Sequence, residues 1–556
     1  MRIRALNFLF AILFILLAAY LYYLQVIKGP LYRDLSYKNS IRLLSIAAPR
    51  GIIYDRNNNA IVDNTLAFGV FIVPQEASDV DSEIAELSSL LNIPESLLKR
   101  NYKRNYQAPF APCELLKSVS KREAVLIEEA KLDMPGVLVR EFPLRRHIYK
   151  EASAHVVGYV GEINKSELEL LRSYGYNAKD LIGKSGIEKV IDGHLRGKDG
   201  GMQVQVDNRG RQVKILNFKR PRKGNDISLT IDAKLQNFLW KAMKGKKGAA
   251  VFMDVSSGEI LAMVSAPSYD PEGSILNALN DSDTPLLNRA IMGQYPPGSI
   301  FKIIIALAGL ESGKITPETE FLCRGRLKVG AGSFHCWNRD GHGPMQIKDA
   351  IAQSCNIYFY NAGLSLGAEK ILEYARSFGF GKKARIDLLG EMQGFLPSRA
   401  WKKIERRESW YAGDTANLSI GQGYVLVTPL QIVRMVAAVA NGGYLIEPHV
   451  LEREPKKIKL KLQEKNLQLI RGAMRGVVDD ENGTGFRAWS SDVSIAGKTG
   501  TSQPGGDLRT HAWFAGFAPY EEPEISFVIF LEHGGSGGEV AALIARKAVE
   551  FWYRNR

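Results

Sequence analysis

The chain has 556 residues, a formal net charge of +14 at pH 7, and 45% hydrophobic and 24% charged residues. This length has room for two or three domains and excludes a single small module. The positive charge is not evidence of nucleic-acid binding, because no nucleic-acid-binding motif accompanies it and the N-terminal segment indicates export across a membrane.

That N-terminal segment, Ala5 to Ile27, is apolar and contains no charged residue. As a helix it spans about 35 Å, which is enough to cross a bilayer. Arg2 and Arg4 precede it, so the positive-inside rule predicts a cytoplasmic tail at residues 1–4 and places the rest of the chain outside the membrane. A cleavable signal peptide is the alternative. The long apolar core and the bulky tyrosines near its end favour an uncleaved anchor over residues 5–27.

From residue 28 to about 225, short β-rich runs alternate with helical stretches rich in lysine and glutamate. A strand is then predicted at Ile227–Ile231, and Gly248–Met253 with Glu259–Val264 reads as a hairpin. Apolar patterns predict further helices and strands in chain order: helices at 299–312, 346–365, 368–378 and 429–441, strands at 493–497, 511–518 and 525–531, and a closing helix at 539–552. This order predicts an α+β domain with a sheet covered by helices.

A basic run extends from Arg209 to Lys223, where seven of fifteen residues are lysine or arginine. The preferred interpretation is a solvated basic strand or linker. Attraction to anionic lipid headgroups or to a wall polymer is the alternative.

Ser299 follows two prolines and a glycine and precedes a long apolar run. Prolines and a glycine before an apolar run predict a turn that leads into a helix, with Ser299 at or near the helix N-terminus. Lys302 lies one helical turn later on the same face. A serine nucleophile needs a base. Lys302 can serve only if burial, or a nearby positive charge such as Lys498, lowers its pKa.

A four-residue Ser-x-x-Lys is weak evidence by itself. An N-capping serine followed by a lysine with a solvated head is the commoner explanation. The same spacing recurs at Ser118 to Lys121, but no Pro-Gly entry precedes it and no apolar helix follows it.

Two further motifs lie downstream. Ser354-Cys355-Asn356 offers a hydroxyl that can relay a proton and an amide that can hold a carbonyl or a lysine. Alone, this motif is better explained as a polar connection between helices.

Lys498-Thr499-Gly500-Thr501 offers a cation and two hydroxyls, a suitable receptor for a terminal carboxylate. Gly500 removes a side chain where a substrate backbone can approach. The alternative is a purely structural role, as an exposed strand end with a solvated lysine.

In this order, S-x-x-K, S-x-N and K-T-G form the signature set of active-site serine penicilloyl transferases. With them the chain resembles a class B, monofunctional penicillin-binding protein over nearly its whole length. The family-like stretches are residues 49–57, 154–161, 183–188, 229–232, 419–424 and 428–431. Trp337, the Gly341–Gly343 stretch and Tyr358–Tyr360 resemble the elongation type, penicillin-binding protein 2. One departure is Asn356, where aspartate is often expected in that subfamily.

The resemblance implies a transmembrane anchor, a β-rich pedestal (dimerisation-type) domain at 28–225 with a head subdomain at roughly 65–140, and a transpeptidase domain at 226–556. It implies a peptidoglycan D,D-transpeptidase that cross-links stem peptides ending in D-Ala-D-Ala during wall elongation and that β-lactams inhibit. Ser299, Lys302, Ser354, Asn356 and Lys498 would be catalytic. Substrate would be bound by the rest of the K-T-G-T motif: Thr499, Gly500 and Thr501.

The resemblance also implies that backbone N–H groups of Ser299 and Thr501 form an oxyanion hole, and that catalysis needs no cofactor. It places the enzyme in the bacterial inner membrane, with a SEDS-family glycosyltransferase of the RodA type as partner. A D,D-carboxypeptidase, with water as acceptor, is one alternative function. A scaffold that activates the glycosyltransferase is another.

Three of the four cysteines, Cys323, Cys336 and Cys355, lie within 33 residues of one another, together with His335 and His342. Thiolates and imidazole are the ligands that zinc prefers. Cys323, Cys336, His342 and Cys355 are therefore a candidate structural zinc site beside the second motif. A Cys323–Cys336 disulfide and buried free thiols are the alternatives.

Overall fold

The N-terminal segment is helical. In this computed structural model, which describes residues 2–207, 212–503 and 508–556, α1 (Arg2–Tyr22) continues into a π-helical turn, η1 (Tyr23–Ile27). Residues Ile3–Ile27 form one apolar helical span of 25 residues that is not buried against the rest of the protein. Within the described residues this is the one helix of sufficient length and apolarity to cross a membrane. It fits a single-pass membrane anchor.

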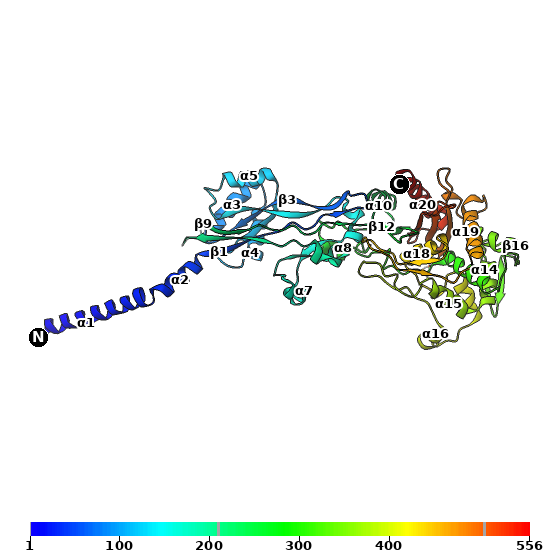
Figure 1. Cartoon of the computed structure of the whole chain (residues 1–556), viewed down its shortest axis with the longest axis horizontal. Helices are drawn as coiled ribbons and strands as arrows, with labels where there is room; N and C mark the ends of the chain where they lie inside the picture. Colours follow the sequence, from blue (N-terminus) through cyan, green and yellow to red (C-terminus); the bar gives the residue numbers. More distant parts are fainter. Residues whose placement is uncertain (1, 208–211, 504–507) are drawn as a thin grey trace. The chain divides into compact units, whose positions relative to one another are not determined.

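The chain divides into two compact units (Figure 1). The first contains residues up to 51, 64–146 and 196–225, and the second contains residues 52–63, 147–195 and 226–556. After α1 and η1 the first unit contains α2 (Gly29–Asn39), β1 (Ile41–Ile46), most of β3 (Ala60–Ile72), α3 (Val80–Leu91), α4 (Glu95–Asn105), β4 (Cys113–Val119), α5 (Lys121–Glu129), β5 (Val137–His147, all but its last residue), β8 (Gly200–Val206) and β9 (Gln212–Lys219).

The first unit holds two groups of strands. β1, β8 and β9 form an antiparallel sheet, and β3 pairs with both β4 and β5. Apolar side chains of α3, α4, α5 and the strands form a separate core that includes Ile84, Leu98 and Ile127. Ser118 lies on β4 while Lys121 begins α5, so the second Ser-x-x-Lys does not share one helical face.

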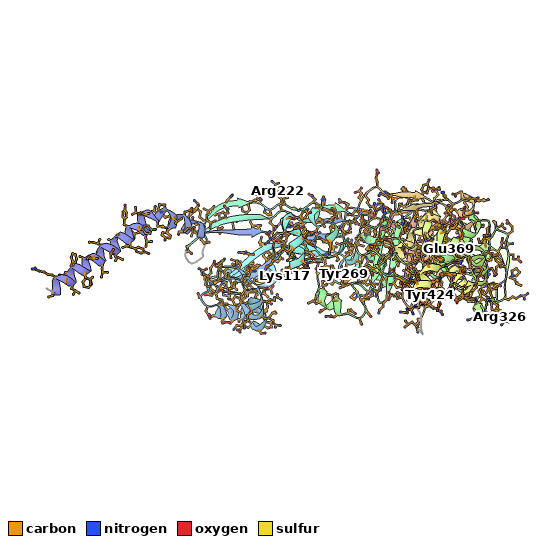
Figure 2. All side chains as sticks on the ribbon, turned by 90° about the horizontal axis from the view of Figure 1, so that it is seen from below. Lys117, Arg222, Tyr269, Arg326, Glu369 and Tyr424 are labelled. Carbon is orange, nitrogen blue, oxygen red and sulfur yellow. The ribbon has the colours of Figure 1, made fainter. Side chains whose placement is uncertain are left out.

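The basic run falls mainly on β9. Lys214 and Lys219 are exposed there, as a solvated basic strand requires. Arg222, labelled in Figure 2, pairs through its backbone with Lys198. Residues 209–211 of the run lie outside the described residues.

The second unit is built on a five-stranded antiparallel sheet in the order β12-β11-β21-β20-β19. Its strands are β11 (Gly248–Asp254), β12 (Ile260–Ala266), β19 (Ala496–Ser502), β20 (His511–Ala518) and β21 (Ile525–Leu531). β11 and β12 confirm the predicted hairpin. Along β11, Ala249 and Val251 face one apolar core while Ala250 and Phe252 face another, so both faces of the sheet are covered.

Helices supply the two covering layers. α10 (Ala233–Met243) and α20 (Ala542–Asn555) contribute to the core on one face. The other face packs on α18 (Pro429–Ala440) and α19 (Glu464–Asp479). The core beneath them also includes residues of α12 (Lys302–Glu311), α13 (Ile347–Ala352), α14 (Asn356–Leu366) and α15 (Ala368–Ser377).

The remaining elements of the second unit are short. They are β2 (Ile53–Tyr54), η2 (Lys150–Ala152), α6 (Ala154–Val157), β6 (Val160–Glu162), α7 (Lys165–Leu171), η3 (Arg172–Tyr174), β7 (Leu181–Gly183), α8 (Gly186–Val190), α9 (Asp192–Leu195), β10 (Ile227–Ser228), α11 (Ile275–Asn280), η4 (Gly298–Phe301), β13 (Phe321–Cys323), β14 (Arg326–Val329), β15 (Gly332–His335), β16 (Gly343–Met345), α16 (Arg399–Glu405), α17 (Ala412–Ser419), β17 (Tyr444–Ile446), β18 (Lys457–Lys459), η5 (Phe486–Ala488) and η6 (Gly537–Ala541).

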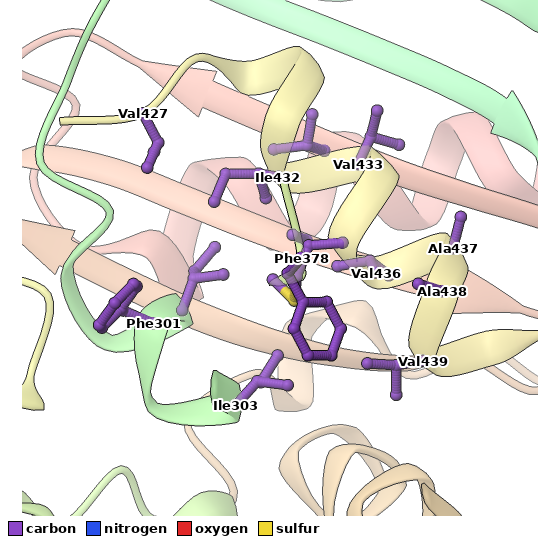
Figure 3. Close-up of a cluster of buried hydrophobic side chains, with 14 of the residues drawn as sticks. Phe301, Ile303, Phe378, Val427, Ile432, Val433, Val436, Ala437, Ala438 and Val439 are labelled. Atoms are coloured by element: carbon purple, nitrogen blue, oxygen red, sulfur yellow. The ribbon is translucent and has the colours of Figure 1, made fainter. Parts of the chain in front are cut away.

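α18 is buried on all sides and lies at the centre of this unit. A capping box explains where it begins: the Thr428 hydroxyl accepts from Gln431 N–H, the Gln431 side chain accepts from Thr428 N–H, and Pro429 occupies the first turn. Figure 3 shows its apolar side chains gathered with Phe301 and Ile303 around Phe378. The segment that carries Ser299 therefore rests on a rigid core.

Three predicted elements differ from the structure. The strand predicted at 227–231 is only β10 (Ile227–Ser228). The helix predicted at 346–365 is two helices, α13 and α14, because Ser354 between them has a φ of +54° and interrupts the helical backbone. The strand predicted at 493–497 is β19, which starts at Ala496 and runs through the whole K-T-G-T motif. Pairing with β20 over residues 511–517 draws the motif into the sheet.

Candidate active site

Ser299 lies in a 3-10 turn, η4, that leads directly into α12. This confirms the prediction that it stands at a helix N-terminus. Gly298 before it has a φ of +55°, and its N–H donates to the Gly421 carbonyl at 3.0 Å. A Cβ at Gly298 would lie 2.7 Å from the Thr501 carbonyl oxygen, so only glycine allows η4 to lie this close to β19.

Lys302 is fully buried one turn after Ser299. Its Nζ donates to the Ser354 carbonyl at 2.8 Å, to Ser354 Oγ at 3.2 Å and to Asn356 Oδ1 at 2.7 Å. Burial lowers the pKa of Lys302 to about 8, although the nearby Cys355 and Cys336 thiols act in the opposite direction. The first and second motifs therefore meet at an ammonium group that loses its proton easily.

Ser354 occupies the tight turn between α13 and α14. Its positive φ places the chain in the left-handed region, which lets its carbonyl and its hydroxyl reach the same Lys302 ammonium group. Asn356 then begins α14, and its Nδ2 donates to the His335 carbonyl at 3.2 Å while its Oδ1 accepts from Lys302. The amide thus has both its donor and its acceptor in use.

Lys498 is also fully buried, on β19. Its Nζ donates to the Thr499 carbonyl at 3.0 Å. Burial, and secondarily the charge of Lys302, lowers the pKa of Lys498 well below its usual range. Within the described part of the chain, no carboxylate lies at ion-pair distance from either lysine. A bound anion would supply the missing counter-charge.

The other residues of the third motif differ in exposure. Thr499 is buried and its hydroxyl shares a 2.6 Å hydrogen bond with that of Thr484, whereas Thr501 is exposed. The sequence interpretation of Gly500 as room for a substrate backbone needs correction. A Cβ there would meet Ile300 at 3.0 Å and Trp513 at 3.1 Å, so its missing side chain admits the chain's own residues.

Among the described strands, β19 is the last of its sheet, with β20 on one side only. Its second edge can accept an extended peptide as an added strand. The arrangement therefore combines a helix-terminal serine, a readily deprotonated lysine one turn later, a hydroxyl of the second motif that contacts this lysine, and a strand edge with a second buried lysine. These are the parts that acyl transfer through a serine ester requires.

Sequence reasoning missed two residues at this site. Gln422 donates from Nε2 to the Thr501 carbonyl at 3.4 Å, and Thr484 holds the Thr499 hydroxyl. Gln422 lies in the family-like stretch 419–424, which was a signal for it. Thr484 carries no such signal, because its contact depends on the packing of segments distant in sequence.

The three cysteines and His342 come together beside the second motif. The ligand atoms of Cys323, Cys336, His342 and Cys355 all lie within 4.8 Å of one another. His342 Nδ1 is 3.5 Å from the sulfurs of Cys323 and Cys336. Cys323 and Cys336 are not bridged to each other, and the ring of His335 is not part of the cluster. Three thiols and an imidazole at these separations fit a tetrahedral zinc ion.

Two of these thiols interact directly. A hydrogen bond from Cys355 lowers the pKa of Cys336 to about 4, and the same contact together with burial raises the pKa of Cys355. The thiolate is the form in which cysteine binds metals.

Comparison with known families identifies both parts of the chain. Residues 248–550 match the penicillin binding protein transpeptidase domain, and residues 45–229 match the penicillin-binding protein dimerisation domain.

The relatives agree over nearly the full length. The peptidoglycan D,D-transpeptidase MrdA of Salmonella typhimurium (strain SL1344) is 33% identical and aligns with 95% of this chain and 92% of its own length. MrdA of Escherichia coli (strain K12) is 32% identical and aligns with 95% of this chain and 90% of its own length. Stage V sporulation protein D of Bacillus subtilis (strain 168) is 29% identical and aligns with 96% of this chain and 82% of its own length.

Solved structures agree as well. A complex between penicillin-binding protein PBP2 and MreC from Helicobacter pylori contains a chain with a TM-score of 0.80 and 29% identity, covering 92% of this chain and 99% of its own. Pseudomonas aeruginosa PBP2 in complex with WCK 5153 has a TM-score of 0.70 and 32% sequence identity, and the match covers 92% of this chain and 96% of that one. A peptidoglycan synthase complex, described as coordinating polymerization and crosslinking, contains a chain with a TM-score of 0.75 and 30% identity. This match covers 100% of this chain and 99% of that one. The chain belongs to the penicillin-binding protein family, as a serine-type peptidoglycan D,D-transpeptidase of the penicillin-binding protein 2 type.

Proposed function

We propose that this transpeptidase acts through an acyl-enzyme on Ser299 during cell-wall elongation. The observation that carries this proposal is Lys302, fully buried one turn after Ser299, hydrogen-bonded to Ser354 and Asn356, and with its pKa lowered to about 8. A neutral amine at this position is a base for the Ser299 hydroxyl at a pH near neutrality.

The reaction then has two halves. Lys302 takes the proton of Ser299, and Ser299 Oγ attacks the carbonyl between the two D-alanines of a donor stem peptide. Backbone N–H groups of Ser299 and Thr501 stabilise the oxyanion. The C–N bond breaks, and D-Ala leaves with a proton relayed through Ser354. An amine of a neighbouring stem then attacks the ester carbonyl, the C–O bond to Ser299 Oγ breaks as the new amide forms, and the proton lost by the amine passes to Ser299 Oγ through Lys302. Lys302 is assigned as the base because its amine is held by Ser354 and Asn356 one turn after Ser299.

The donor's terminal carboxylate is proposed to bind at Lys498, Thr499 and Thr501, with Gly500 keeping β19 close to η4. Lys498 has no counter-ion among the described residues, and its pKa lies well below its usual range. A carboxylate would raise that pKa again, so substrate binding and protonation of Lys498 support each other. β-Lactams are expected to mimic the donor and to leave a slowly hydrolysed ester on Ser299.

The acceptor separates transpeptidation from the carboxypeptidase alternative. With a stem pentapeptide donor and a stem peptide carrying a free amine, we expect free D-Ala and an amide-linked dimer, measured by liquid chromatography and mass spectrometry. Ser299→Ala should yield neither product. Hydrolysed donor with no dimer at saturating acceptor would contradict the transpeptidase assignment and support the carboxypeptidase.

A membrane glycosyltransferase of the SEDS family, RodA type, is the proposed partner. The similar structure of a peptidoglycan synthase complex supports this. Scaffolding can coexist with catalysis. If it does, Ser299→Ala will still stimulate glycan polymerisation by the partner while failing to cross-link. The proposed domain limits are residues 28–225 for the pedestal, with the head at roughly 65–140, and 226–556 for the transpeptidase domain.

We further propose that residues 5–27 anchor the chain in the bacterial inner membrane with residues 1–4 in the cytoplasm. The apolar helix Ile3–Ile27 and the arginines at its start support this orientation. The catalytic unit then faces the extracytoplasmic side, where peptidoglycan is.

Cys323, Cys336, His342 and Cys355 are proposed to hold a structural zinc ion. Bound zinc would supply a cross-link and no chemical step, and catalysis needs no cofactor. The cluster ties the residues around β13 and β15 to Cys355, next to Ser354 and Asn356. The second motif would therefore be braced by the metal.

Metal content tests this site. Protein purified without chelator is expected to contain about one zinc per chain, measured by inductively coupled plasma mass spectrometry. Cys323→Ala should lose the metal and lower the Tm by about 5 °C or more. Cys113→Ala removes a buried thiol of the first unit and should retain the metal. Wild-type protein without stoichiometric metal would eliminate the zinc proposal.

A further inference from the structure

Tyr295 and Pro296, which shortly precede the nucleophile, are attached to the rest of the second unit at three points. Tyr295 exchanges two backbone hydrogen bonds of 2.9 Å with Val427. The Trp513 indole donates to the Pro296 carbonyl at 3.1 Å. The Tyr295 hydroxyl donates to Glu532 at 2.6 Å. The first two attachments involve the backbone of this segment, and only the third depends on a polar side chain within it.

Glu532 is itself held firmly. It follows β21 directly, its N–H donates to the Lys247 carbonyl at 2.8 Å, and its carboxylate accepts from Arg289 Nε at 2.9 Å. The Arg289 side chain is only 3% exposed, against 16% for Glu532. Three further N–H groups of Arg289 donate to Asp283 and Thr284. The guanidinium is thus held at four of its five N–H groups, and it fixes the position of the Glu532 carboxylate.

The Tyr295 ring touches the strand that pairs with the K-T-G-T strand. Its centroid lies 4.0 Å from that of Phe530, 6.3 Å from Trp513 and 5.6 Å from His511. Trp513 and His511 lie on β20, opposite Gly500 and Ser502 of β19. Tyr295 therefore connects the backbone four residues before Ser299 with the part of the sheet that carries Thr501.

A purely apolar role does not explain this residue. The ring is surrounded by aromatic side chains, and phenylalanine would fill the same space. The chain instead has a hydroxyl here and buries a carboxylate and a guanidinium to receive it, which costs desolvation energy. Such a polar network restricts the segment to one geometry, where apolar packing alone tolerates small shifts.

We propose that Tyr295, held by Glu532 and Arg289, is a positioning residue that sets the spacing between Ser299 and the Thr501 end of β19. The inference rests on the proposed function, since it assumes that Ser299 is the nucleophile and that the Thr501 N–H receives the oxyanion. Acyl transfer is sensitive to this spacing, because a shift of a fraction of an ångström weakens both the attack geometry and the oxyanion contacts.

The test compares Tyr295→Phe with Tyr269→Phe. Tyr269, labelled in Figure 2, is a buried tyrosine of the same unit, and its hydroxyl lies 3.0 Å from the Ala154 carbonyl and 3.3 Å from Ser185 Oγ. Each variant loses one hydrogen-bonded hydroxyl, so both should lower the Tm slightly. The readouts are the limiting acylation rate and the half-saturating concentration for a chromogenic β-lactam.

We expect Tyr295→Phe to lower the limiting acylation rate about tenfold with little change in half-saturation. Tyr269→Phe should leave both kinetic values unchanged. Glu532→Gln keeps an acceptor for the Tyr295 hydroxyl and should retain most of the wild-type acylation rate. Glu532→Ala removes this acceptor and should acylate more slowly than Glu532→Gln. This pair provides a second test if Tyr295→Phe fails to fold.

Two results would overturn the inference: folded Tyr295→Phe that acylates at the wild-type rate, or equal losses in Tyr295→Phe and Tyr269→Phe. Failure of the proposed function gives a different result, namely wild-type protein that forms no adduct on Ser299.

Discussion

Replacing Ser299 by alanine is expected to abolish covalent capture of benzylpenicillin, because the only atom proposed to attack the lactam carbonyl is removed. The rate of acylation should fall by about four orders of magnitude or more relative to wild type, as rates do when the nucleophile of a serine hydrolase is deleted. Intact-mass spectrometry measures this directly: wild-type protein should gain one penicilloyl group per chain, and Ser299→Ala should gain none.

The chain provides a matched control for this variant. Ser118 has the same Ser-x-x-Lys spacing, but it lies on β4 while its lysine begins α5. Ser118→Ala should therefore be acylated like wild type. An adduct that persists on Ser299→Ala would place the nucleophile elsewhere. Folded wild-type protein without an adduct would contradict the catalytic assignment and favour the scaffold.

Replacing Lys302 by methionine should slow acylation by about three orders of magnitude, the usual contribution of a well-placed general base. Methionine keeps the length of the side chain and removes the amine. It leaves the Ser354 carbonyl and Asn356 Oδ1 without their donor, so a modest loss of stability is expected as well. Stopped-flow acylation with a chromogenic β-lactam measures the rate, and thermal unfolding measures the stability.

The pH dependence of acylation gives a second measure of Lys302. Because its pKa is about 8, the rate should rise with pH and level off above pH 8. It should be about a hundredfold lower at pH 6 than on the plateau. Lys302→Met should lose this rise. A wild-type rate that is flat from pH 6 to 9 would contradict the assignment of Lys302 as the base.

The same shift affects folding with a defined sign. The unfolded chain holds the Lys302 proton up to about pH 10.5 and the folded chain only up to about pH 8. Between these values the unfolded state binds more protons, so the contribution of this residue to the free energy of unfolding rises with pH.

Much of the site was predictable because each motif includes its own local structure. Proline and glycine before an apolar run predict the turn that places Ser299 at the start of α12, and that turn is present. The two apolar runs of β11 and β12, separated by a short turn, are an equally local signal. The order of the three motifs then identified the family before any distance was known.

The features of the site that could not be predicted depend on contacts between segments distant in sequence. The burial of Lys302 and Lys498 follows from the packing of α12 against α14 and of η4 against β19. Gly500 was interpreted as room for substrate because a sequence does not show that Ile300 and Trp513 occupy that space. Thr484 and Glu532 could not be recognised for the same reason, since their partners are 15 and 237 residues away.

The backbone of Ser354 shows that the fold is not optimised for stability at this point. A residue with a Cβ at a φ of +54° is strained by about 1 kcal/mol, and glycine would adopt this turn without strain. The turn aims both oxygens of Ser354 at Lys302, and glycine would keep only the carbonyl. The serine at position 354 therefore exchanges some backbone stability for a second oxygen at the Lys302 amine, which is the oxygen that the proposed proton relay uses.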